Sequence, residues 1–309
     1  MPRIATVFGA TGHQGVAVVD ALLKDGTFVP RAVTRDPSSP AARELASRGA
    51  QVVAADLGDK EAVKKALSGA EVAFGVTIPF TPLSEVVQGE NMVDAAKEEG
   101  VKFFVFSSLV SVAEVSKGKY TKVTHFEGMF ALSQGRSADK VTVSKHLQAS
   151  GLPNSRVIAG FFLENFLKLM PIVKTGDKYV VKLPLTPKGV LGYTWIGHDL
   201  GPVVTALFKL YHEKLAEINN VDFDIAHARA SLNDVIGEIA HEIGKPITIE
   251  RAPPSGVEAL DDIYDFATEF DLLDGRQVPD PKLVALGIKQ EGTIREFVQQ
   301  VLKPVLDKQ

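Results

Sequence analysis

The stretch that decides the fold runs from Ile4 to Val16 and reads IATVFGATGHQGV. Its first five residues are apolar or β-branched, which is typical of a buried strand. Gly9, Gly12 and Gly15 then form a turn, and apolar residues at helical spacing follow. Such a turn lets the backbone approach a pyrophosphate at a helix N-terminus, where free N–H groups and the helix dipole favour negative charge. The stretch predicts dinucleotide binding; the alternative is a glycine turn that only packs the helix on the strand.

The composition is that of an ordinary globular protein. The chain has 309 residues, a net charge of −4 and no cysteine, so a basic nucleic-acid face, disulfides and thiolate metal sites are not expected. No apolar stretch reaches the ~18 residues of a membrane span, and the chain enters its first strand without a signal-like segment. We therefore expect a cytoplasmic protein, with the nucleus as the alternative, that binds neither nucleic acid nor membrane.

Strand and helix signals alternate through the first half of the chain. The expected strands are Arg3–Phe8, Thr27–Val33, Gln51–Ala55, Ala70–Val76, Lys102–Ser107 and Asn154–Ala159. Asp59 is the expected cap of a helix over Lys60–Leu67. This alternation predicts an α/β fold, a Rossmann-type doubly wound parallel sheet.

The pattern changes after Gly160. A helix is expected over Phe161–Lys174 and strands over Lys178–Leu183, Val221–Ala226 and Ile247–Glu250. We expect residues 1–159 with 190–228 to form the NAD(P)-binding Rossmann domain. Residues 160–189 with 229–309 are then a smaller α+β C-terminal domain that faces the substrate or a partner.

The end of the second strand selects the cofactor. Ala32–Pro37 reads AVTRDP. An acid there binds a ribose hydroxyl of NAD, whereas an arginine accommodates the 2′-phosphate of NADP. Arg35 favours NADP, while a shift of one residue would let Asp36 serve NAD. Exposed turn charges without a ligand are the other alternative.

Further polar residues follow the neighbouring strands. Asp56 can accept from an adenine amino group or can cap a turn. Because the carboxyl ends of parallel strands share one edge, the residues after the fourth and fifth strands are expected beside the ribose and nicotinamide. The cofactor contacts expected from their positions along the strands and the turn are Gly9, Thr11, Gly12, His13, Gln14, Gly15, Arg35, Asp56, Val76, Thr77, Ser107 and Ser108.

With these segments, the chain resembles the NmrA-like family, atypical members of the short-chain dehydrogenase/reductase superfamily. The resemblance is carried by the glycine turn, Ala32–Pro37, Phe104–Leu109 (FVFSSL), His125-Phe126, Phe161–Phe166 (FFLENF) and the segment from Trp195 to Gly201. It implies a Rossmann domain, a small C-terminal domain and bound NADP or NAD. It adds Phe161 and Asn165 to the expected cofactor contacts. Aromatic residues of these segments could wall a hydrophobic substrate pocket, but at helical spacing they are more typical of a core: Phe161, Phe162, Phe166 and Trp195.

Two departures concern the chemistry. The superfamily's Tyr-x-x-x-Lys pair is missing, since Thr124 stands four residues after Tyr120. Counting from His125 puts Met129 at the family's lysine position, whereas counting back from Leu147 puts Lys140 there, which requires an insertion between them. Lys140 and His125 are the candidate catalytic residues; a solvated lysine and a loop histidine are the alternatives.

Two functions follow. The first is an NADPH-dependent reductase of a small carbonyl, quinone or conjugated substrate, with Lys140, His125 or water handling the proton. The second is a non-catalytic NAD(P) redox sensor that regulates a protein partner, which the missing tyrosine favours. The remaining histidines lack metal-ligand spacing, so no metal site is expected.

Overall fold

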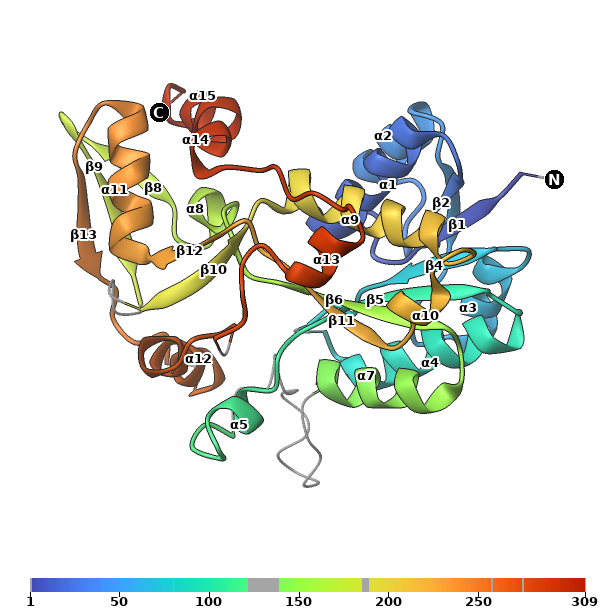
Figure 1. Cartoon of the computed structure of the whole chain (residues 1–309). Helices are drawn as coiled ribbons and strands as arrows, with labels where there is room; N and C mark the ends of the chain where they lie inside the picture. The colour runs from blue at the N-terminus through green and yellow to red at the C-terminus, as the bar shows by residue number, and fades with distance from the viewer. Residues whose placement is uncertain are drawn as a thin grey trace. The chain divides into compact units, whose positions relative to one another are not determined.

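The structure is a computed structural model that describes residues 2–79, 81–121, 139–184, 189–256, 258–273 and 275–308. It contains two compact units (Figure 1). The first consists of the described residues within 1–109, 124–158 and 200–223, and the second of those within 110–123, 159–199 and 224–309. Within the described ranges, no helix is both long and apolar enough to span a bilayer.

A seven-stranded sheet of order β11-β6-β5-β4-β1-β2-β3 underlies the first unit. Its strands are β1 (Ile4–Val7), β2 (Val29–Thr34), β3 (Gln51–Ala54), β4 (Val72–Gly75), β5 (Phe103–Ser108), β6 (Asn154–Ala159) and β11 (Val221–Ile225). All pairings from β3 to β6 are parallel. The strand order reverses direction between β1 and β4, where open α/β sheets bind their ligands. The Rossmann-type doubly wound sheet is confirmed.

Helices on both faces bury the sheet. The first layer contains α3 (Lys60–Leu67), α4 (Glu85–Glu98) and α7 (Asp139–Ser150), which lie side by side (Figure 1). On the other face, α1 (His13–Asp25) packs on α9 (Ile196–Leu210), because Gly201 leaves room for the Ala17 carbonyl. Buried apolar strands suit a sheet that is covered in this way.

Local sequence sets the helix starts. Ser39 caps α2 (Pro40–Ser47), and Ser84 caps α4. Asp59 accepts hydrogen bonds from two backbone amides of α3, which confirms it as the cap of that helix. Each cap satisfies N–H groups that have no partner within the helix.

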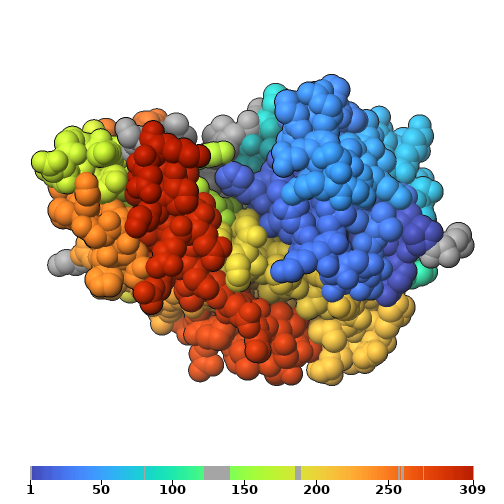
Figure 2. Space-filling view, turned by 90° about the horizontal axis from the view of Figure 1, so that it is seen from above, coloured from blue at the N-terminus to red at the C-terminus, as the bar shows by residue number. Residues whose placement is uncertain are grey.

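The second unit is a mixed α+β body with two three-stranded sheets, of order β12-β10-β7 and β13-β9-β8. Its strands are β7 (Phe161–Phe162), β8 (Ile172–Thr175), β9 (Lys178–Leu183), β10 (Val190–Thr194), β12 (Ala228–Ser231) and β13 (Ile247–Arg251). The principal helices are α11 (Leu232–Ile243), α12 (Glu258–Glu269), α13 (Pro281–Ala285), α14 (Ile294–Phe297) and α15 (Lys303–Leu306). The red C-terminal segment lies against the orange segment that contains α11 (Figure 2).

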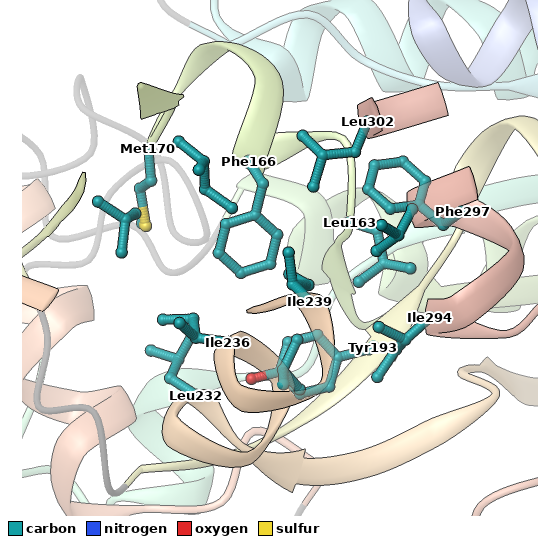
Figure 3. Packing of buried hydrophobic residues seen from close by; sticks show 14 of the residues in the cluster. Leu163, Phe166, Met170, Tyr193, Leu232, Ile236, Ile239, Ile294, Phe297 and Leu302 are labelled. Carbon is teal, nitrogen blue, oxygen red and sulfur yellow. The ribbon is translucent and has the colours of Figure 1, made fainter. Parts of the chain in front are cut away.

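The expected helix over Phe161–Lys174 is wrong. That segment forms β7, the short helix α8 (Asn165–Lys168) and β8. Its apolar residues satisfy both periodicities, and pairing with β10 and β9 selects strands at its two ends. Phe166 and Trp195 belong to the buried core of this unit, with half-buried Phe161 packed against it. Figure 3 shows Phe166, Tyr193 and Phe297 converging in this core.

Candidate functional site

The glycine turn after β1 has the shape that the sequence predicts. Gly9 has φ +63°, in the left-handed region, and a Cβ there would lie 2.7 Å from Val76 Cγ1. A Cβ on Gly15 would lie 2.2 Å from the Gly9 carbonyl oxygen. The chain therefore needs glycine at both positions, one for the turn and one for the close packing of α1 on it.

The N-terminus of α1 carries no side-chain cap. Its N-cap residue is Gly12, and no acidic residue lies in the first turn. By contrast, side chains cap α2, α3 and α4. The first amides of α1 are thus left for another acceptor, and a phosphate group suits them because the helix dipole adds partial positive charge.

A cavity of about 470 Å³ opens beside this turn, at the carboxyl ends of β1 to β4. This volume is within the usual range for small-molecule sites. Predicted residues in its wall are Gly9, Thr11, Arg35 and Asp56. Residues of the wall that were not predicted include Ser39, Ile78, Leu83 and Gln88.

Arg35 and Asp36 differ in how they are held. Both residues are exposed on the cavity wall. The Asp36 carboxylate accepts from the Ser38 amide (2.8 Å) and the Ser38 hydroxyl (2.6 Å), and these bonds lower the pKa of Asp36. Asp36 is therefore engaged in a local turn, which leaves Arg35 as the cavity side chain suited to a phosphate.

Asp56 makes the expected turn contact, while its contact with an adenine stays a prediction. Its Oδ1 accepts from the Gly58 amide at 2.8 Å, which is a turn contact, while the residue also lines the cavity.

The loop opposite is held by Gln88, which is 2% exposed. Gln88 accepts from the Ile78 amide (2.8 Å) and donates to the carbonyl oxygens of Ile78 (3.0 Å) and Leu83 (3.1 Å). No sequence motif pointed to Gln88, because its hydrogen-bond partners are brought to it only by the fold.

The hydroxyl residues at the end of β5 contact other elements of the site. Ser107 Oγ donates to Gln14 Oε1 at 2.6 Å, which joins β5 to the start of α1. Ser108 Oγ lies 2.7 Å from Ser144 Oγ of α7, and both serines are buried. Ser107, Ser108 and Gln14 are thus brought together at the predicted edge of the sheet.

Lys140 is not a solvated lysine. It is 7% exposed, and its Nζ lies 2.8 Å from Glu85 Oε2. It also donates to the carbonyl oxygen of Thr77, at 3.2 Å, and to the Thr77 hydroxyl. The Thr77 hydroxyl in turn donates to Glu85. The predicted residues Lys140 and Thr77 therefore meet at the carboxyl end of β4, together with Glu85, which sequence reasoning missed.

This ion pair limits what Lys140 can do. An ammonium group has three N–H donors. Among the described residues, Lys140 has three acceptors, namely Glu85 Oε2, the Thr77 carbonyl oxygen and the Thr77 hydroxyl oxygen. Donation to any further oxygen requires that one of these bonds be exchanged.

Some predicted residues are not part of this constellation. His125 and Met129 lie outside the described residues, and the choice between Met129 and Lys140 at the family position stays a prediction. Phe161 and Asn165 belong to the second unit, so their contact with a cofactor also stays a prediction. Thr11, Gly12 and His13 are exposed on the turn, and Val76 and Thr77 follow β4. In the described part of the chain, no three His, Asp or Glu side chains gather at a metal-binding spacing.

The first unit fits the adenosine diphosphate part of a dinucleotide. The Gly9 turn and the uncapped helix would receive the pyrophosphate, and the cavity beside Arg35 would receive the adenosine. Thr77, Ser107 and Ser108 lie at the ends of the next two strands of the same sheet. The site therefore suits a nucleotide cofactor in its geometry and in the chemistry of its donors.

Solved structures share this fold. The structure of NmrA, a negative transcriptional regulator, in complex with NADP matches with a TM-score of 0.78 and 19% identity, covering 100% of this chain and 98% of that chain. The NADPH-dependent quinone oxidoreductase QOR2 of Escherichia coli, complexed with NADPH, matches with a TM-score of 0.70 and 22% identity, covering 97% of this chain and 100% of that chain.

Two relatives illustrate the similarity in sequence. An NmrA-like family domain-containing protein of Dictyostelium discoideum is 32% identical over 222 residues, which is 68% of each chain. An NmrA-like family domain-containing oxidoreductase of Aspergillus hancockii is 36% identical over 53% of this chain and 48% of the relative. The alignment thus spans only about half the length of this fungal relative. The family model for the NmrA-like family matches residues 2–284. The chain belongs to the NmrA-like family.

Proposed function

We propose that the protein binds NADP(H) in its first unit and acts as a reductase of a small carbonyl, quinone or conjugated substrate. The observation that carries the cofactor proposal is the uncapped N-terminus of α1 behind the Gly9 turn, beside a cavity with Arg35 on its wall. NADP is preferred over NAD because, although Arg35 and Asp36 both line the cavity, the Asp36 carboxylate is already engaged with Ser38. The NmrA structures include complexes with NADP and with NAD, and the quinone oxidoreductase was solved with NADPH.

In this proposal the cofactor supplies the hydride, and the chain binds and orients the cofactor and the substrate. Backbone amides of the turn hold the pyrophosphate, and Arg35 pairs with the 2′-phosphate through charge-assisted hydrogen bonds. Ser108, held by Ser144, offers a hydroxyl near the ring. Lys140 supplies positive charge near the developing oxyanion. His125 is a second candidate for proton handling.

A non-catalytic sensor is the second candidate. It is favoured by the hydrogen bonding of Lys140, whose ammonium N–H groups already have three acceptors among the described residues. In this case the second unit would contact a protein partner in response to cofactor occupancy. The fold of the regulator NmrA is compatible with this alternative.

Turnover separates the two candidates. NADPH oxidation is measured for the wild type against a panel of quinones, aldehydes and conjugated enones, with NADPH affinity measured in parallel by calorimetry. Binding with turnover supports the reductase, and Lys140→Met should then lower kcat. Tight binding without turnover on any substrate would replace the reductase with the sensor. Absence of binding would refute both.

A further inference from the structure

Glu85 is the least expected member of the site. It begins α4, its side chain is 5% exposed, and its carboxylate receives both the Lys140 ammonium and the Thr77 hydroxyl. A carboxylate out of water is costly unless donors compensate it. Ser84 already caps this helix, so Glu85 does not serve as the cap.

The packing of α4 on α7 brings this pair together. One turn beyond Glu85, a Cβ on Gly89 would lie 2.2 Å from Val143 Cγ2, so the two helices approach closely there. Val143 is fully buried and lies one turn beyond Lys140. Residues three or four apart share a helix face. The Gly89–Val143 contact thus sets Glu85 opposite Lys140.

We propose that Glu85 is a positioning residue that holds the Lys140 ammonium in place beside Thr77. This inference deepens the proposed function and rests on it for the meaning of Lys140. Lys140 serves the site as a fixed, hydrogen-bonded charge in the free protein. It turns toward a ligand oxygen only by exchanging a bond to Thr77, while Glu85 keeps its charge in place.

The reason is electrostatic. A charge-assisted hydrogen bond to a carboxylate is stronger than one to a neutral oxygen. Without the Glu85 carboxylate, Lys140 Nζ loses its charged partner and is held less firmly beside Thr77, so a reagent reaches it more readily. The chemical reactivity of Lys140 therefore reports on Glu85 directly.

The test is acylation of the cofactor-free protein with acetic anhydride at pH 8, quantified by mass spectrometry. Lys140 labelling is normalised to that of Lys24, which is exposed on α1. We expect Glu85→Gln to raise Lys140 labelling about tenfold, because only the charge is removed. Glu85→Asp keeps the charge and should stay close to the wild type.

Val143→Ala is the matched control, since it loosens the same helix contact without removing charge. Equal labelling of Lys140 in the wild type and Glu85→Gln would overturn the inference. So would a rise of the same size in Val143→Ala, which would show that packing rather than charge protects Lys140.

A second arm separates this inference from the proposed function. Labelling of Glu85→Gln is repeated with saturating NADPH. Protection of Lys140 supports both ideas. Raised labelling without protection leaves Glu85 as the positioning residue and removes Lys140 from the cofactor's surroundings. A protein that binds NADPH but shows no Glu85 effect retains the proposed function and loses the inference.

Discussion

Replacing Lys140 with methionine should destabilise the protein strongly, independently of any activity. At the 2.8 Å separation of Lys140 Nζ and Glu85 Oε2, the Coulomb attraction is about 6 kcal/mol for an effective dielectric constant of ~20. Desolvation of the two charges offsets most of it. Lys140→Met removes the attraction and leaves Glu85 desolvated, with the Thr77 hydroxyl as its remaining donor in the described part of the chain. Breaking a buried pair in this way costs about 3–5 kcal/mol.

The double variant Lys140→Met/Glu85→Gln sharpens this prediction. The neutral amide can still accept from Thr77, so the remaining cost should be only about 1–3 kcal/mol. The double variant should therefore be more stable than Lys140→Met alone. Free energies of unfolding are measured by urea titration, followed by circular dichroism. The free energy of unfolding is also measured for Glu85→Gln alone. If the loss in the double variant equals the sum of the losses in the two single variants, Lys140 and Glu85 do not form a coupled buried pair.

Three further predictions concern other parts of the first unit. Arg35→Ala should weaken NADPH binding by at least about tenfold, the value of a charge-assisted hydrogen bond, and leave NADH binding unchanged in fluorescence titrations; equal losses would show that Arg35 does not bind the 2′-phosphate. Gln88→Leu leaves the amide and carbonyl groups of its loop without their partner, so it should lower the melting temperature and weaken both cofactors alike; selective loss of one cofactor would contradict this. Hydrogen bonds from Arg3, Tyr211 and His212 hold the pKa of Glu71 at about 2, below its ordinary 4.5. Glu71 thus stabilises the fold above pH 4.5, and this contribution is lost as the pH falls toward 2, so Glu71→Gln should flatten the acid limb of stability against pH.

The parallel sheet could be predicted from the sequence, because the patterns that indicate its strands and helices are local. The strand Asn154–Ala159 and the helix Lys60–Leu67 begin and end where they were expected. The second unit was less predictable. The strands Val190–Thr194 and Ala228–Ser231 are short, and their antiparallel pairing rather than their composition defines them.

The candidate site divides in the same way. The glycine turn could be predicted, because Gly9 needs the left-handed backbone of the turn and Gly15 must pack closely on the Gly9 carbonyl group. Glu85 and Gln88 could not, since their partners lie on a loop and on α7 and meet them only through helix packing. Lys140 was found through the family resemblance, and only the structure revealed that it is buried and paired.

The central claim is that the turn before α1 binds the pyrophosphate of a nicotinamide dinucleotide, and Gly12→Ala tests it most directly. A Cβ at Gly12 would lie 3.4 Å from the Gly9 carbonyl oxygen, and the backbone at Gly12, with φ −90° and ψ 171°, is open to alanine. The fold should therefore accept the change, whereas the added methyl group stands where the backbone must approach the pyrophosphate. Gly237→Ala, which meets nothing within 4 Å, is the control.

NADPH affinity is measured by isothermal titration calorimetry for the wild type and both variants, with circular dichroism to verify folding. If the turn binds the pyrophosphate, Gly237→Ala should keep the wild-type affinity, and a folded Gly12→Ala should lose about tenfold or more. Undiminished NADPH affinity in a folded Gly12→Ala, or no binding by the wild type, would contradict it.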